Sequence, residues 1–209
     1  MCKIDFLGSI PRNITLACSG GPDSMAVLDF LIKGRKNVTV AYFDHGTDHG
    51  ETAREFLVDF CEKNNIAIKL GAISNAKPKE KSLEEWWRDE RYDFLNSIPG
   101  KKITCHHLDD VAEWWIFSSL NGNPRLIPYE NGNIIRPFLL TPKEALVSWC
   151  KRKTVPFVTD PGNKNLRFAR SRIRHNIVPE ALKINPGLLK VLKKKIIRSH
   201  SLEDSFDQY

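Results

Sequence analysis

Short β-branched runs alternate with longer helical patterns through the first half of the chain, and this alternation restricts the fold more than any other feature. Strands are predicted over residues 13–18, 37–43, 66–73 and 101–105. Helices are predicted between them, over residues 24–33, 50–64 and 82–96, and a further helix begins near Asp109. Strands separated by helices form mostly parallel sheets with helices on both faces. We therefore expect an α/β fold of this type.

The pattern loosens after residue 120, where Gly and Asn mark turns before a short apolar segment at 134–140. The sequence T-P-x-E from Thr141 predicts a helix to Lys153, with Pro142 at its first position and Glu144 completing a capping box. A loop then leads into basic helical segments. We expect residues 1–140 to form the α/β domain and residues 141–209 a helical basic extension packed on it.

The charge of the chain is uneven. Its formal net charge is +7, and residues 161–200 hold eleven Lys or Arg against one acid, Glu180. Such a basic end is typical of a nucleic-acid-binding region, although a solvated basic helix has the same composition. The five cysteines are scattered without a C-x-x-C pair, which argues against a disulfide framework or a structural zinc site. The sequence has no signal-peptide pattern and no apolar run long enough to span a membrane, so we expect a cytoplasmic protein.

The junction between the first predicted strand and the first predicted helix reads Ser19-Gly20-Gly21-Pro22-Asp23-Ser24. Ligands of open α/β sheets bind at such junctions, and two glycines let backbone N–H groups approach an anion at the helix N-terminus. Ser19 and Ser24 add hydroxyl groups, while Asp23 would bind Mg²⁺ or orient the loop. A Gly-Gly turn with a serine helix cap is the structural alternative. The loop has no Walker lysine, which argues against a kinase or an ordinary ATPase.

Further polar segments follow the loop in order. They are Asp44-His45-Gly46, Arg88-x-x-Arg91-Tyr92, His106-His107-x-Asp109-Asp110-x-x-Glu113, Arg136-Pro137, Asp160-Pro161-x-Asn163 and Arg170-x-x-x-Arg174-His175. Together with S-G-G-P-D-S, this ordered set resembles the tRNA(Ile)-lysidine synthetases, a family of N-type ATP pyrophosphatases, over residues 14–179. The resemblance implies an adenine nucleotide alpha hydrolase-like fold, with the ATP-binding PP-loop domain in residues 1–140.

Enzymes of that family use ATP to adenylate the wobble cytidine of an isoleucine tRNA with a CAU anticodon, and then join free lysine to the activated ring carbon. AMP and pyrophosphate are the other products, and Mg²⁺ is the implied metal. The resemblance implies an ATP site made of the loop residues Ser19, Gly20, Gly21, Asp23 and Ser24 together with Asp44 and His45. It also implies that His106 acts beside the nucleotide and that Asp110 and Glu113 recognise lysine.

The spacing of the charged residues is compatible with this chemistry. Asp110 and Glu113 lie three residues apart on one helix face, where they could hold Mg²⁺ or a lysine ammonium. Acids in a first helical turn also complement the helix dipole without any further role. Arg88 and Arg91 share a face where they could neutralise an adenylate, although Glu84 is placed to pair with Arg88.

The basic region is the predicted tRNA-binding surface. Arg170 and Arg174 lie in one helical stretch, and three cations recur every fourth residue on the next helix, at Lys190, Lys194 and Arg198. They border an apolar face that can dock on the domain, formed by Leu188, Leu189, Leu192 and Ile196. Basic side chains bind phosphates and release counterions. A basic amphipathic helix on an anionic membrane is the alternative.

The chain departs from the family pattern in several places. Trp87, Trp114, Gly162 and Ser171 replace the usual residues, and residues 121–125 replace an expected R-G-x-G loop. Longer members carry C-terminal domains that help to select tRNA, so we expect this chain to be a short form. The alternatives are a PP-loop tRNA thiolase that uses Cys105 or Cys150 as a sulfur carrier, and a noncatalytic tRNA-binding relative.

Overall fold

The computed structural model describes residues 3–160 and 168–206, apart from the side chains of Asp48 and residues 202–206. Its strands are β1 (Asn13–Ala17), β2 (Asn37–Asp44), β3 (Ala67–Ala72), β4 (Lys102–Thr104), β5 (Glu130–Asn131) and β6 (Ile134–Ile135). Its helices are α1 (Pro22–Lys33), α2 (Asp48–Lys63), α3 (Leu83–Ser97), α4 (Leu108–Leu120), α5 (Lys143–Lys153), α6 (Ala169–Arg172), α7 (Val178–Ile184) and α8 (Leu188–Phe206). A 3-10 turn spans Pro137–Leu140, and a π-helical segment spans Ile173–Ile177.

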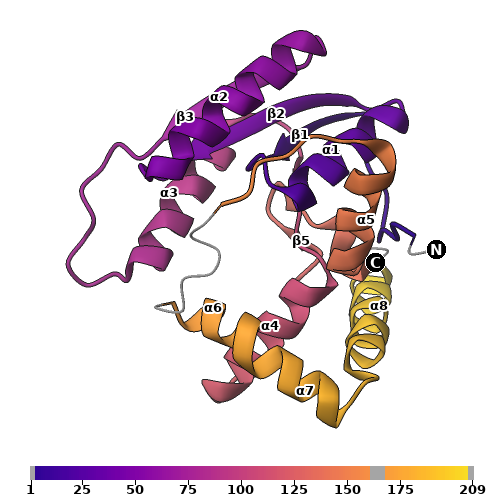
Figure 1. Cartoon of the computed structure of the whole chain (residues 1–209). Helices are drawn as coiled ribbons and strands as arrows, with labels where there is room; N and C mark the ends of the chain where they lie inside the picture. The colour runs from indigo at the N-terminus through magenta and orange to yellow at the C-terminus, as the bar shows by residue number, and fades with distance from the viewer. Residues whose placement is uncertain (1–2, 161–167, 207–209) are drawn as a thin grey trace.

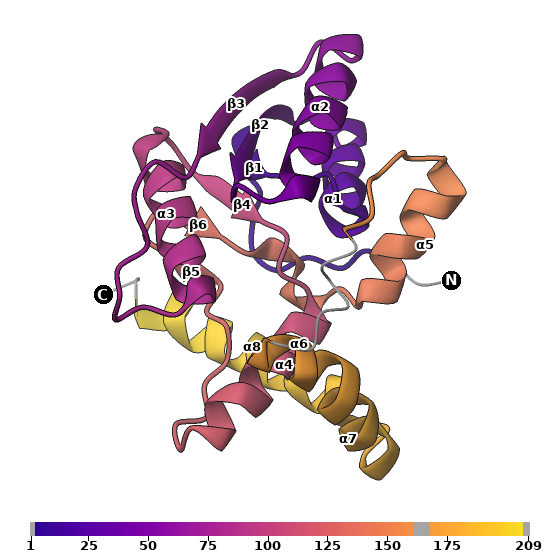
Figure 2. The same ribbon diagram turned by 60° about the vertical axis from the view of Figure 1, so that its left-hand side comes forward.

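The described strands form one six-stranded sheet in the order β3-β2-β1-β4-β6-β5, parallel except for the β5–β6 pair (Figures 1 and 2). Strand β1 lies between β2, where Ile14 is opposite Val38, and β4, where Leu16 is opposite Ile103. The chain runs from β1 outward to β3 and then returns to the other side of β1. The strand order therefore reverses between β1 and β4, which is where open α/β sheets bind ligands.

Alternate residues of the central strands pack against helices on opposite faces of the sheet. Leu16 and Val40 belong to the main core, which also contains Leu28 of α1, Leu57 of α2 and Leu146 of α5. Their neighbours Ala17 and Ala41 pack on the other face with Leu95 of α3 and Ile98, the residue that follows this helix. This period-two pattern explains why successive residues of β1 and β2 are apolar, because both faces of the sheet are covered at these central strands. The predicted mostly parallel α/β architecture is confirmed.

The helices after residue 140 pack against the α/β unit. Leu146 and Cys150 of α5 join the main core beside α1. Among the described side chains of α8, those of Leu188, Leu192 and Ile196 are buried, and they pack with apolar residues of α4 and the 3-10 turn. The docking face predicted for this helix is confirmed, whereas the boundary at residue 140 remains a prediction. Among the described helices, none is both long and apolar enough to cross a membrane.

The predicted capping box at the start of α5 is wrong. Pro142 is the N-cap residue rather than the first helical residue, and its own side chain makes no capping hydrogen bond. The first N–H of the helix, that of Lys143, is instead accepted by the Asp109 carboxylate. Thr141 is fully buried, and its hydroxyl bonds the backbone N–H and carbonyl oxygen of Asp5 near the N-terminus. The hydroxyl therefore holds the N-terminal segment in place. Helix α3 has a local side-chain cap, because the Ser82 hydroxyl accepts the N–H of Glu85 at 3.2 Å.

Candidate active site

The predicted phosphate loop connects the end of β1 to the start of α1, at the reversal point of the sheet. Ser24 closes the loop, since its hydroxyl donates to the carbonyl oxygen of Gly21 (3.0 Å) and accepts the N–H of Ser19 (3.2 Å). Gly21 is the N-cap of α1 and makes no side-chain cap hydrogen bond. Gly20 has a φ of +78°, and a Cβ there would lie 3.1 Å from Cγ2 of Val158. The loop thus leaves uncapped helix N–H groups, which are donors suited to an anion.

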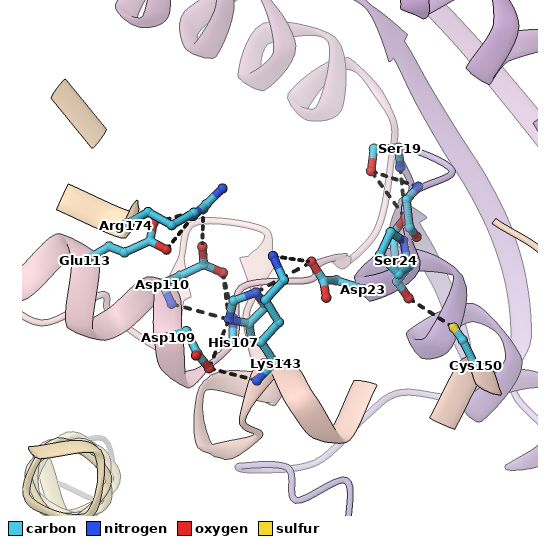
Figure 3. A network of polar contacts seen from close by, with 12 residues as sticks. Ser19, Asp23, Ser24, His107, Asp109, Asp110, Glu113, Lys143, Cys150 and Arg174 are labelled. Atoms are coloured by element: carbon cyan, nitrogen blue, oxygen red, sulfur yellow. Dashed lines mark hydrogen bonds and ion pairs between the residues drawn. The ribbon is translucent and has the colours of Figure 1, made fainter. Parts of the chain in front are cut away.

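Asp23, in the first turn of α1, lies between this loop and the starts of α4 and α5 (Figure 3). Its Oδ2 is 3.6 Å from Nε2 of His107 and 3.7 Å from Nζ of Lys143. Its Oδ1 is buried and has no hydrogen-bond partner among the described residues. A buried carboxylate oxygen without a partner fits the earlier prediction that Asp23 binds Mg²⁺, a metal that usually takes one or two carboxylates together with phosphates and water.

His107 is the N-cap of α4 and links Asp23 to the first turn of that helix. Its Nδ1 accepts the N–H of Asp110 at 3.3 Å, and Asp110 Oδ2 accepts the N–H of His107 at 3.0 Å. Burial would lower the pKa of His107, but the carboxylates of Asp110 and Asp23 outweigh it and raise the pKa above its ordinary value of 6.5. Burial would raise the pKa of Asp110, but the neighbouring histidines and the His107 N–H lower it to about 2. Asp110 is therefore ionised at neutral pH and acts as a helix-capping residue. Protonation of His107 at Nδ1 would remove the acceptor of the Asp110 N–H, so this capping bond requires the unprotonated Nδ1.

The predicted lysine-binding carboxylates are held together by an arginine from the π-helical segment. Arg174 donates from Nε to Glu113 Oε1 (2.6 Å) and from Nη2 to Glu113 Oε2 (2.9 Å), and Nη2 is 3.5 Å from Asp110 Oδ1. Arg170 is more distant, with Nε 3.7 Å from Glu113 Oε2. The Glu113 side chain is only 3% exposed, whereas that of Arg174 is 30% exposed. The carboxylates are therefore paired before any amine binds, and the pairing cation can reach solvent.

His106 faces a different set of groups from its neighbour His107. Its Nδ1 is 2.9 Å from the Thr104 hydroxyl at the end of β4. Burial is the largest influence on its pKa, and although Asp110 opposes it, the arginines around the site, beginning with Arg136, help to lower the pKa to about 3. His106 is therefore neutral at physiological pH, and its role would be that of a hydrogen-bonding group rather than an acid.

A cavity of about 420 Å³ lies at the carboxyl ends of β2 and β3 and is lined by Asp44, His45, Gly46, Ala72, Ile73, Leu83, Trp86 and Trp87. Asp44 accepts the N–H of Gly46 at 2.8 Å, and a Cβ at Gly50 would lie 2.3 Å from Asp44 Oδ1, so a larger residue there would displace the Asp44 carboxylate. Burial and the Arg91 charge lower the pKa of His45 to about 4 against the influence of Asp44. Rings surround this cavity, with His45 and Trp87 centroids 5.5 Å apart.

Arg88 and Arg91, predicted to neutralise an adenylate, have different surroundings. Arg88 is exposed, and its Nε lies 3.9 Å from Asp89 Oδ1, so its ion-pair partner is Asp89 rather than Glu84. Arg91 lies over the ring of Tyr92 (5.7 Å), and burial lowers its pKa. Tyr92 accepts a hydrogen bond from Arg136 Nη2 at 3.1 Å, which ties the Arg136 side chain to α3. Arg91 is therefore the inner residue of the predicted pair.

The five predicted tRNA-binding cations fall into two groups. Arg170 and Arg174 face the buried carboxylates of α4. The other three, Lys190, Lys194 and Arg198, are exposed along α8, on the side away from its buried apolar residues. In the Asp160 segment, Pro161 and Asn163 lie outside the described residues. The structure therefore gives a solvent-facing basic stripe on α8, separate from the carboxylate site.

Sequence reasoning missed three features of this site. His107 is a buried link between Asp23 and Asp110, Lys143 reaches Asp23 from α5, and the adjacent Trp86 and Trp87 border a cavity. The tryptophans resemble ordinary packing residues because their spacing suits a core. Lys143 gives no local signal, since its partners lie far away in the sequence. Of the three features, only the link through His107 has a visible trace in the sequence, namely the adjacent pair His106 and His107.

Comparison with protein families places the chain among phosphate-loop proteins, because the model of the PP-loop domain matches residues 5–181. Curated relatives include the tRNA(Ile)-lysidine synthase of Thermotoga maritima, which is 30% identical over 92% of this chain and 51% of its own length. That of Persephonella marina is 33% identical over 84% of this chain and 42% of its own length. The chain thus spans about half the length of these relatives.

A solved structure with a similar fold is the U34-tRNA thiolase NcsA from Methanococcus maripaludis, which was determined with its [4Fe-4S] cluster. The TM-score is 0.72 at 16% sequence identity, and the match covers 91% of this chain and 73% of that one. At this identity the likeness concerns the fold alone.

Proposed function

Because the chain belongs to the PP-loop domain family, we propose that it is an ATP-dependent tRNA-modifying enzyme that makes lysidine from cytidine and free lysine. The relatives named tRNA(Ile)-lysidine synthase support this substrate pair. The observation that carries the proposal is one continuous set of polar contacts, which runs from Asp23 of the phosphate loop through His107 to Asp110 and, through Arg174, to Glu113. An activation site and an amine-binding site adjacent to each other suit a reaction in two steps.

In the first step, ATP would bind with its phosphates at the N-terminus of α1 and its adenine in the ring-lined cavity. The Ser19 hydroxyl and the uncapped N–H groups would bind phosphate oxygens. Mg²⁺ would be held by the unpartnered Oδ1 of Asp23, and when bound it would neutralise phosphate charge. Arg91 would stabilise charge that develops at the α phosphate as the cytidine oxygen attacks it.

In the second step, the ammonium group of lysine would bind Asp110 and Glu113. These carboxylates already bind a cation, so the amine must replace the guanidinium of Arg174 or share its oxygens. The partial exposure of Arg174 gives it a route into solvent. Neutral His106 would offer a hydrogen bond and no added positive charge, which favours a cationic substrate nearby.

The tRNA would contact the exposed stripe of α8. Three positive charges on one side of a docked helix suit a phosphate backbone and would make binding depend on salt. We expect an isoleucine tRNA to be the substrate, by analogy with the curated relatives, and the motif resemblance implies that its anticodon is CAU.

A thiolase is less well supported by the described cysteines. The Cys150 thiol donates to the carbonyl oxygen of Pro22 (3.3 Å), and burial raises its pKa to about 11. Burial also raises the pKa of Cys105 well above 9.0. A sulfur carrier acts as a thiolate, and neither group favours that form at neutral pH.

The test is to incubate the protein with ATP, Mg²⁺, labelled lysine and bulk tRNA, and then to analyse the nucleosides by mass spectrometry. We expect label in a cytidine derivative, together with AMP and pyrophosphate. Sulfur in place of oxygen would support the thiolase instead. Formation of ADP, or unmodified tRNA together with unused ATP, would contradict the proposal.

A further inference from the structure

The phosphate loop has no lysine of its own, but the fold brings one to it from α5. Lys143 is the first residue of that helix, and its Nζ lies 3.7 Å from Asp23 Oδ2 (Figure 3). Its backbone N–H donates to Asp109 Oδ2 at 2.7 Å, which fixes the start of α5 against the first turn of α4. The base of the side chain is thus anchored while the ammonium points to the N-terminus of α1.

The contact between Lys143 and Asp23 is loose. A separation of 3.7 Å exceeds the usual length of a charge-assisted hydrogen bond, and the Lys143 and Asp23 side chains are 41% and 26% exposed. Ion pairs of this kind contribute little to stability. Asp23 also has a second cationic neighbour, because His107 Nε2 lies 3.6 Å from the same oxygen. Stabilisation of Asp23 alone therefore does not explain an ammonium at this position.

An anion at the N-terminus of α1 gives the ammonium a stronger partner. The flexible stem of a lysine lets its ammonium move by several ångströms, and its three donors bind phosphate oxygens from many directions. Lysines of phosphate-binding loops act in this way on the terminal phosphates of a nucleotide. Here the same charge would come from a helix more than a hundred residues later in the chain.

We propose that Lys143 is a catalytic residue that binds the β and γ phosphates of ATP, a role that rests on the proposed use of ATP. When the cytidine oxygen attacks the α phosphorus, a new P–O bond forms and the bond between the α phosphorus and the bridging oxygen breaks. The electron pair of that bond stays on the departing pyrophosphate. The Lys143 ammonium stabilises this charge by hydrogen bonds and keeps its proton, so no co-reactant is needed.

The test compares the binding of ATP and AMP in the presence of Mg²⁺, because AMP lacks the two phosphates that Lys143 would touch. Binding can be followed by tryptophan fluorescence, since Trp86 and Trp87 line the cavity proposed for adenine. For Lys143→Met, which keeps the aliphatic stem, we expect the Kd for ATP to rise roughly 10- to 100-fold, as for a lost charge-assisted hydrogen bond. The Kd for AMP should change less than about twofold, and Lys143→Arg should recover part of the ATP affinity.

Lys151→Met is the matched control, because Lys151 lies on the same helix and is exposed. This control should bind both nucleotides as the unaltered chain does. An unchanged Kd for ATP in Lys143→Met, or an equal loss for ATP and AMP, would overturn the role of Lys143 while leaving the proposed function intact. If the unaltered chain binds neither nucleotide, the proposed function itself fails, and this inference fails with it.

Discussion

Substitution of Glu113 by glutamine separates the two steps of the proposed reaction. The glutamine keeps the shape of the side chain and one acceptor oxygen, but it removes the charge and turns an amide N–H₂ toward the guanidinium of Arg174. Glu113 accepts two hydrogen bonds from Arg174, at 2.6 and 2.9 Å, and is 3% exposed. A hydrogen bond to a charged group is worth about 1.5–3 kcal/mol.

The remaining contact of Arg174 with Asp110 and the exposure of its guanidinium place the effect at the lower end of this range. Asp110 Oδ1 remains 3.5 Å from Arg174 Nη2, and the partly exposed guanidinium can turn toward water. We therefore expect a loss of about 1.5–2 kcal/mol in unfolding free energy, or about 3–8 °C in Tm for a chain of this size. If lysine binds the same carboxylate, the same energy corresponds to a rise in its KM of roughly 10- to 30-fold.

The assay measures pyrophosphate release and lysine incorporation separately, over a range of lysine concentrations. Adenylation should continue in Glu113→Gln, because the phosphate loop does not contact Glu113, while the lysine requirement rises. Glu180→Gln is the control, since its ion pair with Lys183 is exposed and worth less than about 1 kcal/mol. An unchanged KM for lysine would refute the role of Glu113 in amine binding. A selective loss of adenylation would indicate a metal ligand instead.

Ser24→Ala removes the hydroxyl that closes the phosphate loop and should lower the rate of pyrophosphate release by roughly 10²-fold, as for a small misplacement of the phosphate-binding groups; a rate within twofold of the unaltered chain would show that the loop holds its shape without these two bonds. Replacing the exposed α8 cations Lys190, Lys194 and Arg198 by glutamine should weaken tRNA binding but not ATP binding. The slope of log affinity for tRNA against log salt concentration should become shallower by roughly 0.7–0.9 for each lost phosphate contact. The adjacent His106 and His107 should titrate on opposite sides of pH 6.5 in NMR spectra, because the pKa of His106 is lowered to about 3 and that of His107 is raised. Two resonances that titrate together near pH 6.5 would contradict this geometry. The contribution of His107 protonation to folding free energy is fully present below pH 6.5 and is lost as pH rises through the raised pKa.

The helices and strands could be predicted from the sequence because apolar runs and helix caps depend on residues that are close together in the chain. The apolar runs of β1 and β2 are covered on both faces, and Ser82 caps α3 through a residue three positions away. The start of α5 was mispredicted for the opposite reason. Thr141 bonds Asp5, which is distant in sequence, and this contact competes with the local cap.

The sequence motifs name residues of the candidate site but not their pairings, and the roles of these residues stay predictions. The motifs around Asp110 and Glu113 identified both carboxylates, but no spacing rule places Arg174 on them. Lys143 is the extreme case, because both of its contacts, with Asp23 and Asp109, depend on the packing of α5 against the sheet. Long-range ion pairs of this kind follow from topology, and the local sequence carries no record of them.

The central position of β1 also determines the order in which the site can be assembled during synthesis. Strand β1 can pair with β2 early, since Asn13 is opposite Asn37, but its other partner is made much later, since Thr15 is opposite Lys102. A nascent chain therefore exposes one edge of its middle strand while α3 is still being translated, and N-terminal units fold first. The phosphate loop precedes the carboxylates of α4, then Lys143 and finally Arg174. The proposed site is therefore complete only after Arg174 has been made, and a ribosome-stalled fragment ending before α4 would hold the phosphate loop without Glu113, Lys143 or Arg174.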